Sequence, residues 1–303
     1  MKRVPINQDE FHLTLIYNYN QMKIHHLFYI FVFLCSTGYS QNFRYERSFG
    51  TFKNATSFYI NSAGVVYITD DVTDEVLQID TLGNLFNLIG GYGWEINAFD
   101  DPVDVFADAL KVFVTDKNNH RIQRFDKNLN FIFQFYTRDS DIEEERFGLP
   151  LSAVPSNLGD VFILDSENNR ILKFDLFGNF IMDIGGYDYG SYYLQDPKQL
   201  AISMQNNIYV LDGKEIYIYD NYGTAIGNIE IPGEMRSIRI IFQWLTINSD
   251  KNIYFSNLNS KEQKLIEVIL NGYDDEFEIV SSLVFDAKLY VLTPNSILIF
   301  SPQ

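Results

Sequence analysis

A segment of about 20 residues recurs four times in the middle of the chain, and this repeat constrains the fold more than any other feature. The copies begin at Val65, Lys111, Asp160 and Asn207, each with a short strand of largely apolar residues. Each strand ends on an aspartate, and these aspartates lie about 46 to 49 residues apart: Asp70, Asp116, Asp165 and Asp212. A nearly fixed period of this length indicates that one supersecondary unit is copied along the chain.

Each copy continues in the same way after its first aspartate. A polar turn leads to a second strand ending on another aspartate, and a Gly or Asn turn leads to a third; the second aspartates are Asp80, Asp126, Asp175 and Asp220. Two degenerate copies follow, and we align Ser256 and Thr293 with the first aspartate. Six units of three or four short strands predict an all-β fold, a six-bladed β-propeller.

The sequence also suggests how the ring closes. The last unit ends at Gln303 after three strands, which leaves no fourth strand for the sixth blade. The segment from Phe43 to Phe52 has no blade of its own and is similar to the fourth strands of the other units. We therefore expect the N-terminal strand of the mature chain to complete the last blade, which removes exposed sheet edges. The propeller then takes up residues 41–303.

Residues 22–40 have the order of a secretory signal peptide. Lys23 gives a basic start, Leu27 to Leu34 is an unbroken apolar run, and small residues precede an expected cleavage after Ser40. We interpret the polar residues 1–21 as an upstream extension that does not belong to the natural precursor. The segment predicts export to the periplasm, the cell envelope or the outside.

The same segment bears on membrane attachment. The apolar run is shorter than the ~18 residues that a membrane span needs, so we expect no transmembrane segment in the mature chain. Cys35 is the only cysteine, and it follows the bulky Leu34. Lipid attachment favours a small residue before the cysteine, so we do not expect a lipoprotein anchor at Cys35.

The chain is strongly acidic. It has 23 Lys and Arg residues against 40 Asp and Glu residues, a formal net charge of −17. Nucleic-acid binding depends on Lys and Arg that neutralise phosphates, so we expect no nucleic-acid partner. The charge favours solubility, cations or basic partners.

The segments that begin at Thr115 and Leu164 resemble NHL repeats. Both have an aspartate, an Asn-rich turn, Arg-Ile, a strand and a second aspartate. The resemblance implies a six-bladed propeller of the bacterial exported type. The pairs Asp116 with Arg121 and Asp165 with Arg170 lie at either end of a turn, where an ion pair can bridge the two strands. We therefore interpret the repeated residues as structural, together with Asp70 and Asp212.

Few residues after the signal suggest catalysis, because His120 is the only histidine there. Some six-bladed propellers that resemble gluconolactonase hold a divalent cation with carboxylate and Asn ligands. Candidate ligands here are Asp100, Asp101 and Asp104, with further acidic loops at residues 139–143 and 274–276. Oxygen ligands of this kind suit Ca²⁺. A metal-dependent, lactonase-like hydrolase is therefore the alternative function, and a purely structural component of the cell envelope is a further one.

Binding is the function that the sequence favours. Aromatic residues mix with Gly and Asp in two stretches without strand alternation, and such residues can anchor a partner: Tyr92, Trp94, Tyr187, Tyr189, Tyr192 and Tyr193. Trp244 lies in an apolar run and is expected in the core. We predict a binding module for a protein, peptide or glycan, with no catalytic residues and no required cofactor.

Overall fold

The computed structural model describes residues 40–303. The segments predicted to be an upstream extension (1–21) and a signal peptide (22–40), with Cys35, lie outside the described residues except for Ser40. Within residues 40–303, no helix is long and apolar enough to cross a membrane.

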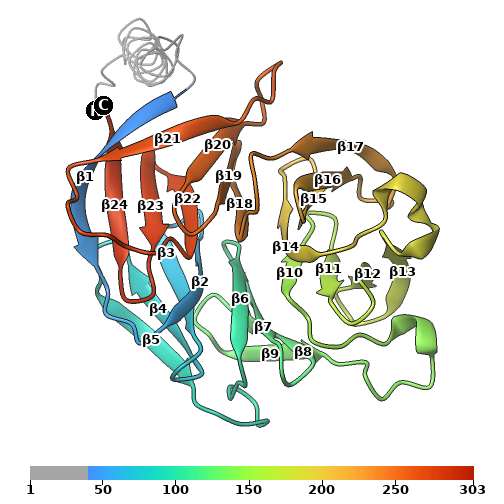
Figure 1. Ribbon diagram of the computed structural model, residues 1–303. Coiled ribbons are helices and arrows are strands. Elements are labelled where there is room, and N and C mark those ends of the chain that lie inside the picture. The colour runs from blue at the N-terminus through green and yellow to red at the C-terminus, as the bar shows by residue number, and fades with distance from the viewer. Residues whose placement is uncertain (1–39) are drawn as a thin grey trace, which may run out of the picture. The chain divides into compact units, whose positions relative to one another are not determined.

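Four sheets of four antiparallel strands follow one another along the chain (Figure 1). The first two consist of β2 (Ala55–Ile60), β3 (Val65–Asp70), β4 (Glu75–Asp80) and β5 (Leu85–Gly90), then β6 (Pro102–Ala107), β7 (Lys111–Asp116), β8 (Arg121–Asp126) and β9 (Phe131–Phe135). The next two consist of β10 (Ser152–Pro155), β11 (Asp160–Asp165), β12 (Arg170–Asp175) and β13 (Phe180–Ile184), then β14 (Pro197–Ile202), β15 (Ile208–Asp212), β16 (Glu215–Tyr219) and β17 (Ala225–Glu230). Two short 3-10 helices, η1 (Glu143–Glu145) and η2 (Tyr187–Tyr192), lie in the linkers between sheets.

The remaining strands form one eight-stranded sheet, in the order β18-β19-β20-β21-β1-β24-β23-β22. Its strands are β1 (Ser40–Phe49), β18 (Ser237–Ile241), β19 (Trp244–Asn248), β20 (Ile253–Asn257), β21 (Ile266–Asn271), β22 (Ser281–Phe285), β23 (Lys288–Leu292) and β24 (Ile297–Pro302). As the sequence predicted, the first described strand pairs with the last: β1 runs antiparallel to β24. The sequence did not predict that β1 also neighbours β21, which joins the last two repeats into one sheet.

The six innermost strands form a closed ring. Each contacts the next in the order β2, β6, β10, β14, β18 and β22, and β22 contacts β2 in turn. Sheets arranged around an axis in this way make an all-β, propeller-like fold, which agrees with the fold class expected from the repeat.

The alternation of strands gives the propeller two faces. In each repeat the first turn joins strands one and two and the second turn joins strands two and three; in the first five repeats a third turn joins strands three and four. The first and third turns lie at one end of the strands, which we call the turn face. The second turns and the linkers between repeats lie at the other end, which we call the linker face. First turns from five repeats line one hollow together, so they gather at the same mouth of the central channel.

The fifth repeat corrects the alignment made from the sequence. We aligned Ser256 with the first aspartate of the repeat, but Ser256 lies in β20, the third strand of its unit. In the four separate sheets, the first aspartate ends the second strand, which is β3, β7, β11 or β15. The corresponding strand in the fifth repeat is β19, which ends on Asn248. The Ser249 hydroxyl then accepts the turn amides of Lys251 and Asn252. The similarity of β20 to a second strand misled the alignment, since both are short and mostly apolar.

The first aspartates of the repeats fasten the linkers to the second turns. The buried Asp70 carboxylate accepts the amides of Lys53 and Asn54 from the linker and of Val72 from the turn. Asp165 does the same with Gly148 and Glu167. Buried backbone amides must be hydrogen-bonded, and one carboxylate in each of these repeats accepts amides from both the linker and the second turn.

Two of these aspartates also bind an arginine across the hairpin. The Arg121 Nε lies 2.7 Å from Asp116 Oδ2, and both side chains are buried. Arg170 pairs with Asp165 at 3.3 Å. Arg121 donates further hydrogen bonds to the carbonyls of Trp94 and Ala98 in the linker, so this arginine orders the linker as well.

The second aspartates of the repeats cap the third turns. The Asp175 carboxylate accepts the amides of Phe177 and Asn179 and the Asn179 side chain. These hydrogen bonds, the one from the Asn179 side chain above all, hold the pKa of Asp175 below its ordinary value. Hydrogen bonds from Asn84 and Asn130 lower the pKa of Asp80 and Asp126 in the same way.

We predict that Asp175→Asn lowers stability at pH 7 and that the difference from wild type vanishes in acid. A lowered folded-state pKa stabilises the fold above the unfolded-state pKa and loses this effect as the pH falls through the folded-state pKa. Urea unfolding at pH 7 and below pH ~3 would measure both. A difference that stays constant with pH would contradict the ionised role of Asp175.

The closing strand is anchored by Phe43, which is completely buried and packs edge-to-face on Phe255 at 6.3 Å. We predict that Phe43→Ala costs about 3–5 kcal/mol in the free energy of unfolding, because it leaves a cavity beside β1. Ile132→Ala, on a half-exposed position of β9, is the control and should cost less than about 1 kcal/mol. Equal costs would mean that β1 adds little to stability.

Candidate functional site

A network of polar side chains fills the centre of the ring. Every inner strand contributes to it, and the members are Ser57, Asp104, Ser152, Gln199, Ser237, Arg239 and Ser281, all buried. Asp104 lies at its centre and accepts hydrogen bonds from Ser57 at 2.9 Å, Ser152 at 2.5 Å and Gln199 at 3.0 Å. Ser237 then joins Gln199 to Ser281. The axis of the propeller is thus polar, but its groups are bonded to one another.

Arg239 supplies the positive charge of this network. Its Nη2 donates to Asp104 Oδ1 at 2.7 Å and to Ser57 Oγ at 2.6 Å. The guanidinium lies 5.9 Å from the centre of the Tyr59 ring, a cation–π contact. A buried charge is tolerated only when it is paired in this way. Arg239 therefore supplies the positive charge that allows Asp104 to be buried in the channel, in the place of the metal ion that the sequence suggested.

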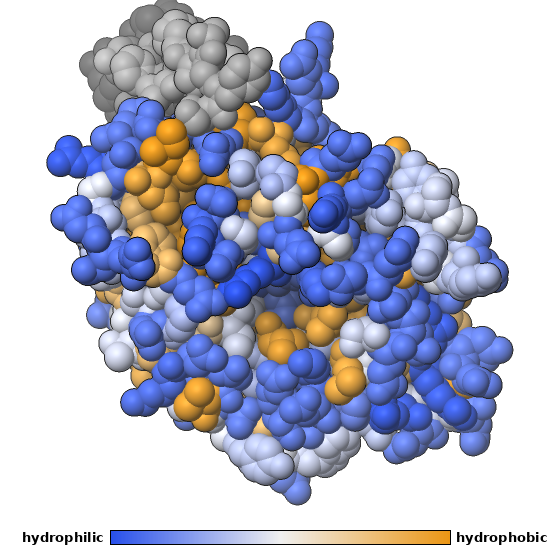
Figure 2. All heavy atoms as spheres, viewed as in Figure 1, coloured by the Kyte–Doolittle hydropathy of each residue, from blue (hydrophilic) through white to orange (hydrophobic). Residues whose placement is uncertain are grey.

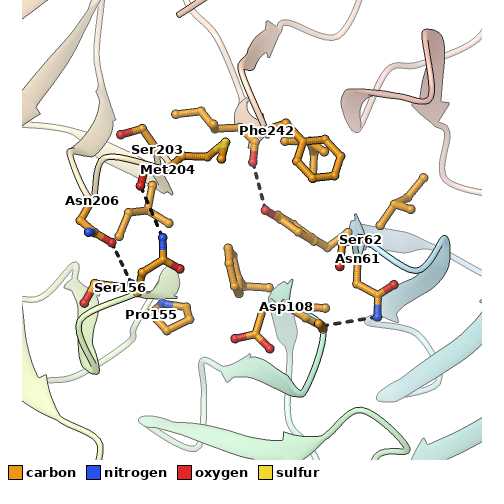
Figure 3. A pocket seen from close by; sticks show the side chains of 18 residues that line it. Asn61, Ser62, Asp108, Pro155, Ser156, Ser203, Met204, Asn206 and Phe242 are labelled. Atoms are coloured by element: carbon orange, nitrogen blue, oxygen red, sulfur yellow. Dashed lines mark hydrogen bonds between the residues drawn. The ribbon is translucent and has the colours of Figure 1, made fainter. Parts of the chain in front are cut away.

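The turn-face mouth of the channel holds a hollow of about 200 Å³. Tyr59 and Phe106 form its floor, with ring centres 4.6 Å apart, and the Tyr59 hydroxyl donates to the Ile240 carbonyl at 3.0 Å. Burial raises the pKa of Tyr59, so this hydroxyl stays protonated. Figure 3 shows that side chains from five turns surround the mouth, among them Asn61, Asp108, Ser156, Met204 and Phe242. Its volume suits one side chain or one ring of a ligand.

The linker face holds a larger hollow, of about 890 Å³. Charged residues of both signs line it: Asp196, Lys198, Lys214, Glu234, Arg236 and Asp250. Lys198 pairs with Asp196, and Arg236 pairs with Glu278. Among the described residues, Lys214, Glu234 and Asp250 form no ion pair. The hollow therefore offers free charges of both signs to a ligand.

The first predicted aromatic stretch lies on the linker face. Tyr92 and Trp94 are both exposed. Trp94 packs edge-to-face on Tyr136 at 5.3 Å, and the Arg121 guanidinium lies 4.8 Å from its ring centre. One face of the indole is thus already covered by the buried arginine, and Tyr92 is the freer of the two.

The second predicted stretch divides into exposed and packed residues. Tyr187 is 90% exposed, and its ring meets that of the partly exposed Tyr193 at 6.4 Å. Tyr189 and Tyr192 instead pack against the core, on Tyr219 and Tyr217 respectively. Tyr193 precedes Asp196 by three residues, which puts it within about 11 Å of the linker-face hollow along the chain.

The predicted calcium ligands are not brought together. Asp104 is inside the channel with Arg239, whereas Asp101 pairs with Lys117 at 3.1 Å and Asp100 accepts a bond from Asn118. No group of three His, Cys, Asp or Glu residues within residues 40–303 could hold a metal ion. Calcium binding stays a prediction without support from this arrangement.

His120 lies in a second turn and not in any of the hollows above. Its Nδ1 accepts the Leu149 amide at 2.9 Å and lies beside Arg138. Burial, and then the Arg138 charge, lowers its pKa, so the ring stays neutral at pH 7. A neutral histidine that accepts a backbone amide has a structural role here.

The comparisons with known proteins identify the fold. No family model matches the chain, and no curated protein matches it. Among solved structures, virginiamycin B lyase from Staphylococcus aureus is similar with a TM-score of 0.59 and 12% identity, over 84% of this chain and 98% of that one. A structure of streptogramin B lyase has a TM-score of 0.58, also at 12% identity, over 85% and 97%.

A third similar structure is a catalytically inactive histidine-to-alanine variant of the Staphylococcus aureus enzyme with quinupristin, with a TM-score of 0.57 and 12% identity, over 84% of this chain and 98% of that one. At this identity the likeness shows the propeller fold alone.

Sequence reasoning missed the polar axis. It selected Asp104 as a metal ligand and did not select Ser57, Gln199, Ser237 or Arg239. The available signal was Arg239 itself, a charged residue within the apolar run Ile238–Ile241. Such a residue can be buried only with a partner of opposite charge, which would have directed attention to an acidic residue on another inner strand.

We predict that Asp104→Ala costs about 3–5 kcal/mol in the free energy of unfolding, because it leaves Arg239 buried and unpaired. Adding Arg239→Met should recover part of this cost. The control is Lys117→Ala, which breaks the partly exposed ion pair with Asp101 and should cost at most about 1 kcal/mol. Denaturant unfolding of the four proteins measures these values. If Arg239→Met recovered no measurable part of the lost free energy of unfolding, the cost of Asp104→Ala would not come from an unpaired Arg239.

Proposed function

We propose that the protein is an exported, NHL-like propeller that binds a peptide segment of a partner protein at the cell envelope. We count the eight-stranded sheet as two blades of four strands, β18 to β21 and β22 to β24 with β1, that meet where β21 neighbours β1, which makes six blades in all. The export step rests on the signal peptide inferred from residues 22–40. The surface that we assign to the partner is the linker face.

The observation that carries this proposal is the hollow of about 890 Å³ on the linker face. Its size lies in the range of ligand sites, and it is larger than the hollows of about 200 Å³ and 400 Å³ on the turn face. Lys214 on one side and Glu234 and Asp250 on another can bind the carbonyl and amide groups or the charged side chains of a peptide. A rigid ring of sheets is a suitable support for such a surface.

Aromatic anchors are present at the same face. Tyr187 is exposed and its ring meets that of Tyr193. A tyrosine side chain has few rotatable bonds, so its conformational entropy cost on binding is low. Aromatic side chains of this kind contribute much of the affinity in protein interfaces. The acidic linkers around them favour a partner with basic residues.

We do not extend lyase activity to this protein. In the virginiamycin B lyase from Staphylococcus aureus, a single histidine-to-alanine change gives a catalytically inactive enzyme. The only histidine among residues 40–303 here is His120, whose Nδ1 is occupied by a backbone amide. Fold likeness by itself does not transfer chemistry.

The proposal predicts that Tyr187→Ser with Tyr193→Ser weakens peptide binding about tenfold or more. The probe is an immobilised set of synthetic peptides of defined charge and sequence, titrated with the full chain. Tyr222→Ser is the matched control, because Tyr222 is an exposed tyrosine on the turn face. Equal loss in both variants, or no bound peptide, would contradict the assignment of the linker face.

The same titration tests the calcium prediction when it is repeated with calcium and with a chelator. Equal peptide affinity with calcium and with the chelator would show that peptide binding does not require calcium. Affinity that requires calcium would bring back the acidic loops as ligands.

A further inference from the structure

Three aromatic residues line the hollow at the turn-face mouth of the channel. Tyr59 and Phe106 form its floor, and Phe242 belongs to the surrounding turns, with 46% of its surface exposed. Met204, which is also exposed, lines the same hollow. The faces of aromatic rings attract cations, and the thioether of a methionine is polarisable. The hollow therefore combines apolar walls with an affinity for positive charge.

Phe242 occupies a backbone position that disfavours its side chain. A turn of two residues joins β18 to β19, since Ile241 pairs with Trp244. Phe242 is the first of the two and has a φ of 55°, in the left-handed region that is costly for a bulky residue and favours glycine in tight hairpin turns. Its ring stacks on Phe285 at 6.5 Å and yet stays half exposed. A strained and exposed aromatic residue of this kind indicates that the side chain is kept for contact with a ligand.

Asp108 gives the hollow its charge, because it is the only charged residue among the described residues that line it. Its Oδ1 accepts the amides of Leu110 and Lys111 at 2.7 Å each. Within residues 40–303, Asp108 forms no ion pair, and its Oδ2 accepts no hydrogen bond. The residues at the same place in three other first turns that line the hollow are neutral: Asn61, Ser156 and Ser203. A neutral side chain is thus sufficient to cap such a turn, and the charge of Asp108 is left for a ligand.

Arg239 does not supply a free positive charge to the hollow. Its guanidinium lies 5.9 Å from the centre of the Tyr59 ring, but it is paired with Asp104 at 2.7 Å. Burial raises the pKa of Tyr59; Arg239 opposes this increase, while Asp104 and Asp108 add to it, so the charge of Asp108 acts on the ring at the floor. The whole chain has a net charge of −17, and hydrophilic residues dominate the side of the molecule in Figure 2. These charges favour a cationic ligand.

The hydrogen-bond acceptors around the hollow are largely used within the protein. Asn61 Oδ1, Ser156 Oγ and Ser203 Oγ accept backbone amides of their own turns. The Ile240 carbonyl accepts the Tyr59 hydroxyl. A primary ammonium group brings three N–H donors that need acceptors. A trimethylammonium group has no N–H donor and presents methyl groups to apolar walls, so it fits this hollow better.

We propose that the hollow at the turn-face mouth binds the trimethylammonium group of a small organic cation such as choline. The methyl groups contact Tyr59, Phe106 and Phe242, and the positive charge lies beside the carboxylate of Asp108. Figure 3 shows Asp108 across the mouth from Met204 and Phe242, so the ligand enters between them. This site is on the opposite face from the peptide surface, and either proposal can fail while the other stands.

The test compares choline with its tert-butyl analogue, an uncharged alcohol of the same shape in which a carbon atom replaces the nitrogen. Both are titrated into the full chain by calorimetry at constant ionic strength. We expect choline to bind at least about tenfold more tightly than the analogue, because only choline interacts with the ring faces and with Asp108 as a cation. No binding of choline at millimolar concentrations, or equal affinities for the two compounds, overturns the proposal.

Three variants assign the binding to this hollow. Asp108→Asn keeps an oxygen that can cap the turn, as Asn61 does, and should weaken choline binding about tenfold; Phe242→Gly removes one ring and should weaken it about threefold or more. The matched control is Glu262→Gln, which removes an exposed carboxylate in the turn between β20 and β21, outside the hollow, and should leave the affinity unchanged. Urea unfolding confirms that each variant is folded. Equal choline affinity in Asp108→Asn and Glu262→Gln would place the binding elsewhere and overturn the proposal.

Discussion

The ion pair of Asp104 and Arg239 at the axis is the interaction on which the arrangement of the sheets depends. The pair joins β6 to β18, on opposite sides of the ring, and Ser57, Ser152 and Gln199 attach three further inner strands to the same carboxylate. An apolar axis would hold these strands only by contact, without direction. Directed bonds from one carboxylate determine which strands face each other, at the cost of two desolvated charges.

The two faces follow from the ring in different ways. At the linker face, buried aspartates bind the amides of long linkers, and this leaves exposed tyrosines and free charges on an ordered support. At the turn face, the turns are short and are capped by their own aspartates, so each can carry one apolar residue at its tip without loss of order. Two different sets of repeated aspartates thus stabilise the two faces, the first aspartates at the linker face and the second aspartates at the turn face.

Much of the fold could be predicted from the sequence, because the repeat reports on local structure. The aspartate at each strand end and the Asn-rich turns are local signals, and the missing last strand indicated the pairing of β1 with β24. The fifth repeat was misaligned at Ser256, since apolar alternation alone does not distinguish the second strand from the third. The polar axis could not be predicted as a set, because each repeat contributes only one or two of its members and these meet only when the ring closes. The aromatic stretches lie in linkers, and the partial burial of Tyr189 and Tyr192 could not be predicted because it depends on the neighbouring β16.

The place of β1 between β21 and β24 has a consequence for the timing of folding. The strand is among the first parts of the propeller to be synthesised, and β24 is the last. Pairing of the two therefore has to wait until the whole chain is available, and the closure joins segments about 250 residues apart, which makes it a slow step. Until then, β1 can pair only with β21, and its edge toward β24 stays open.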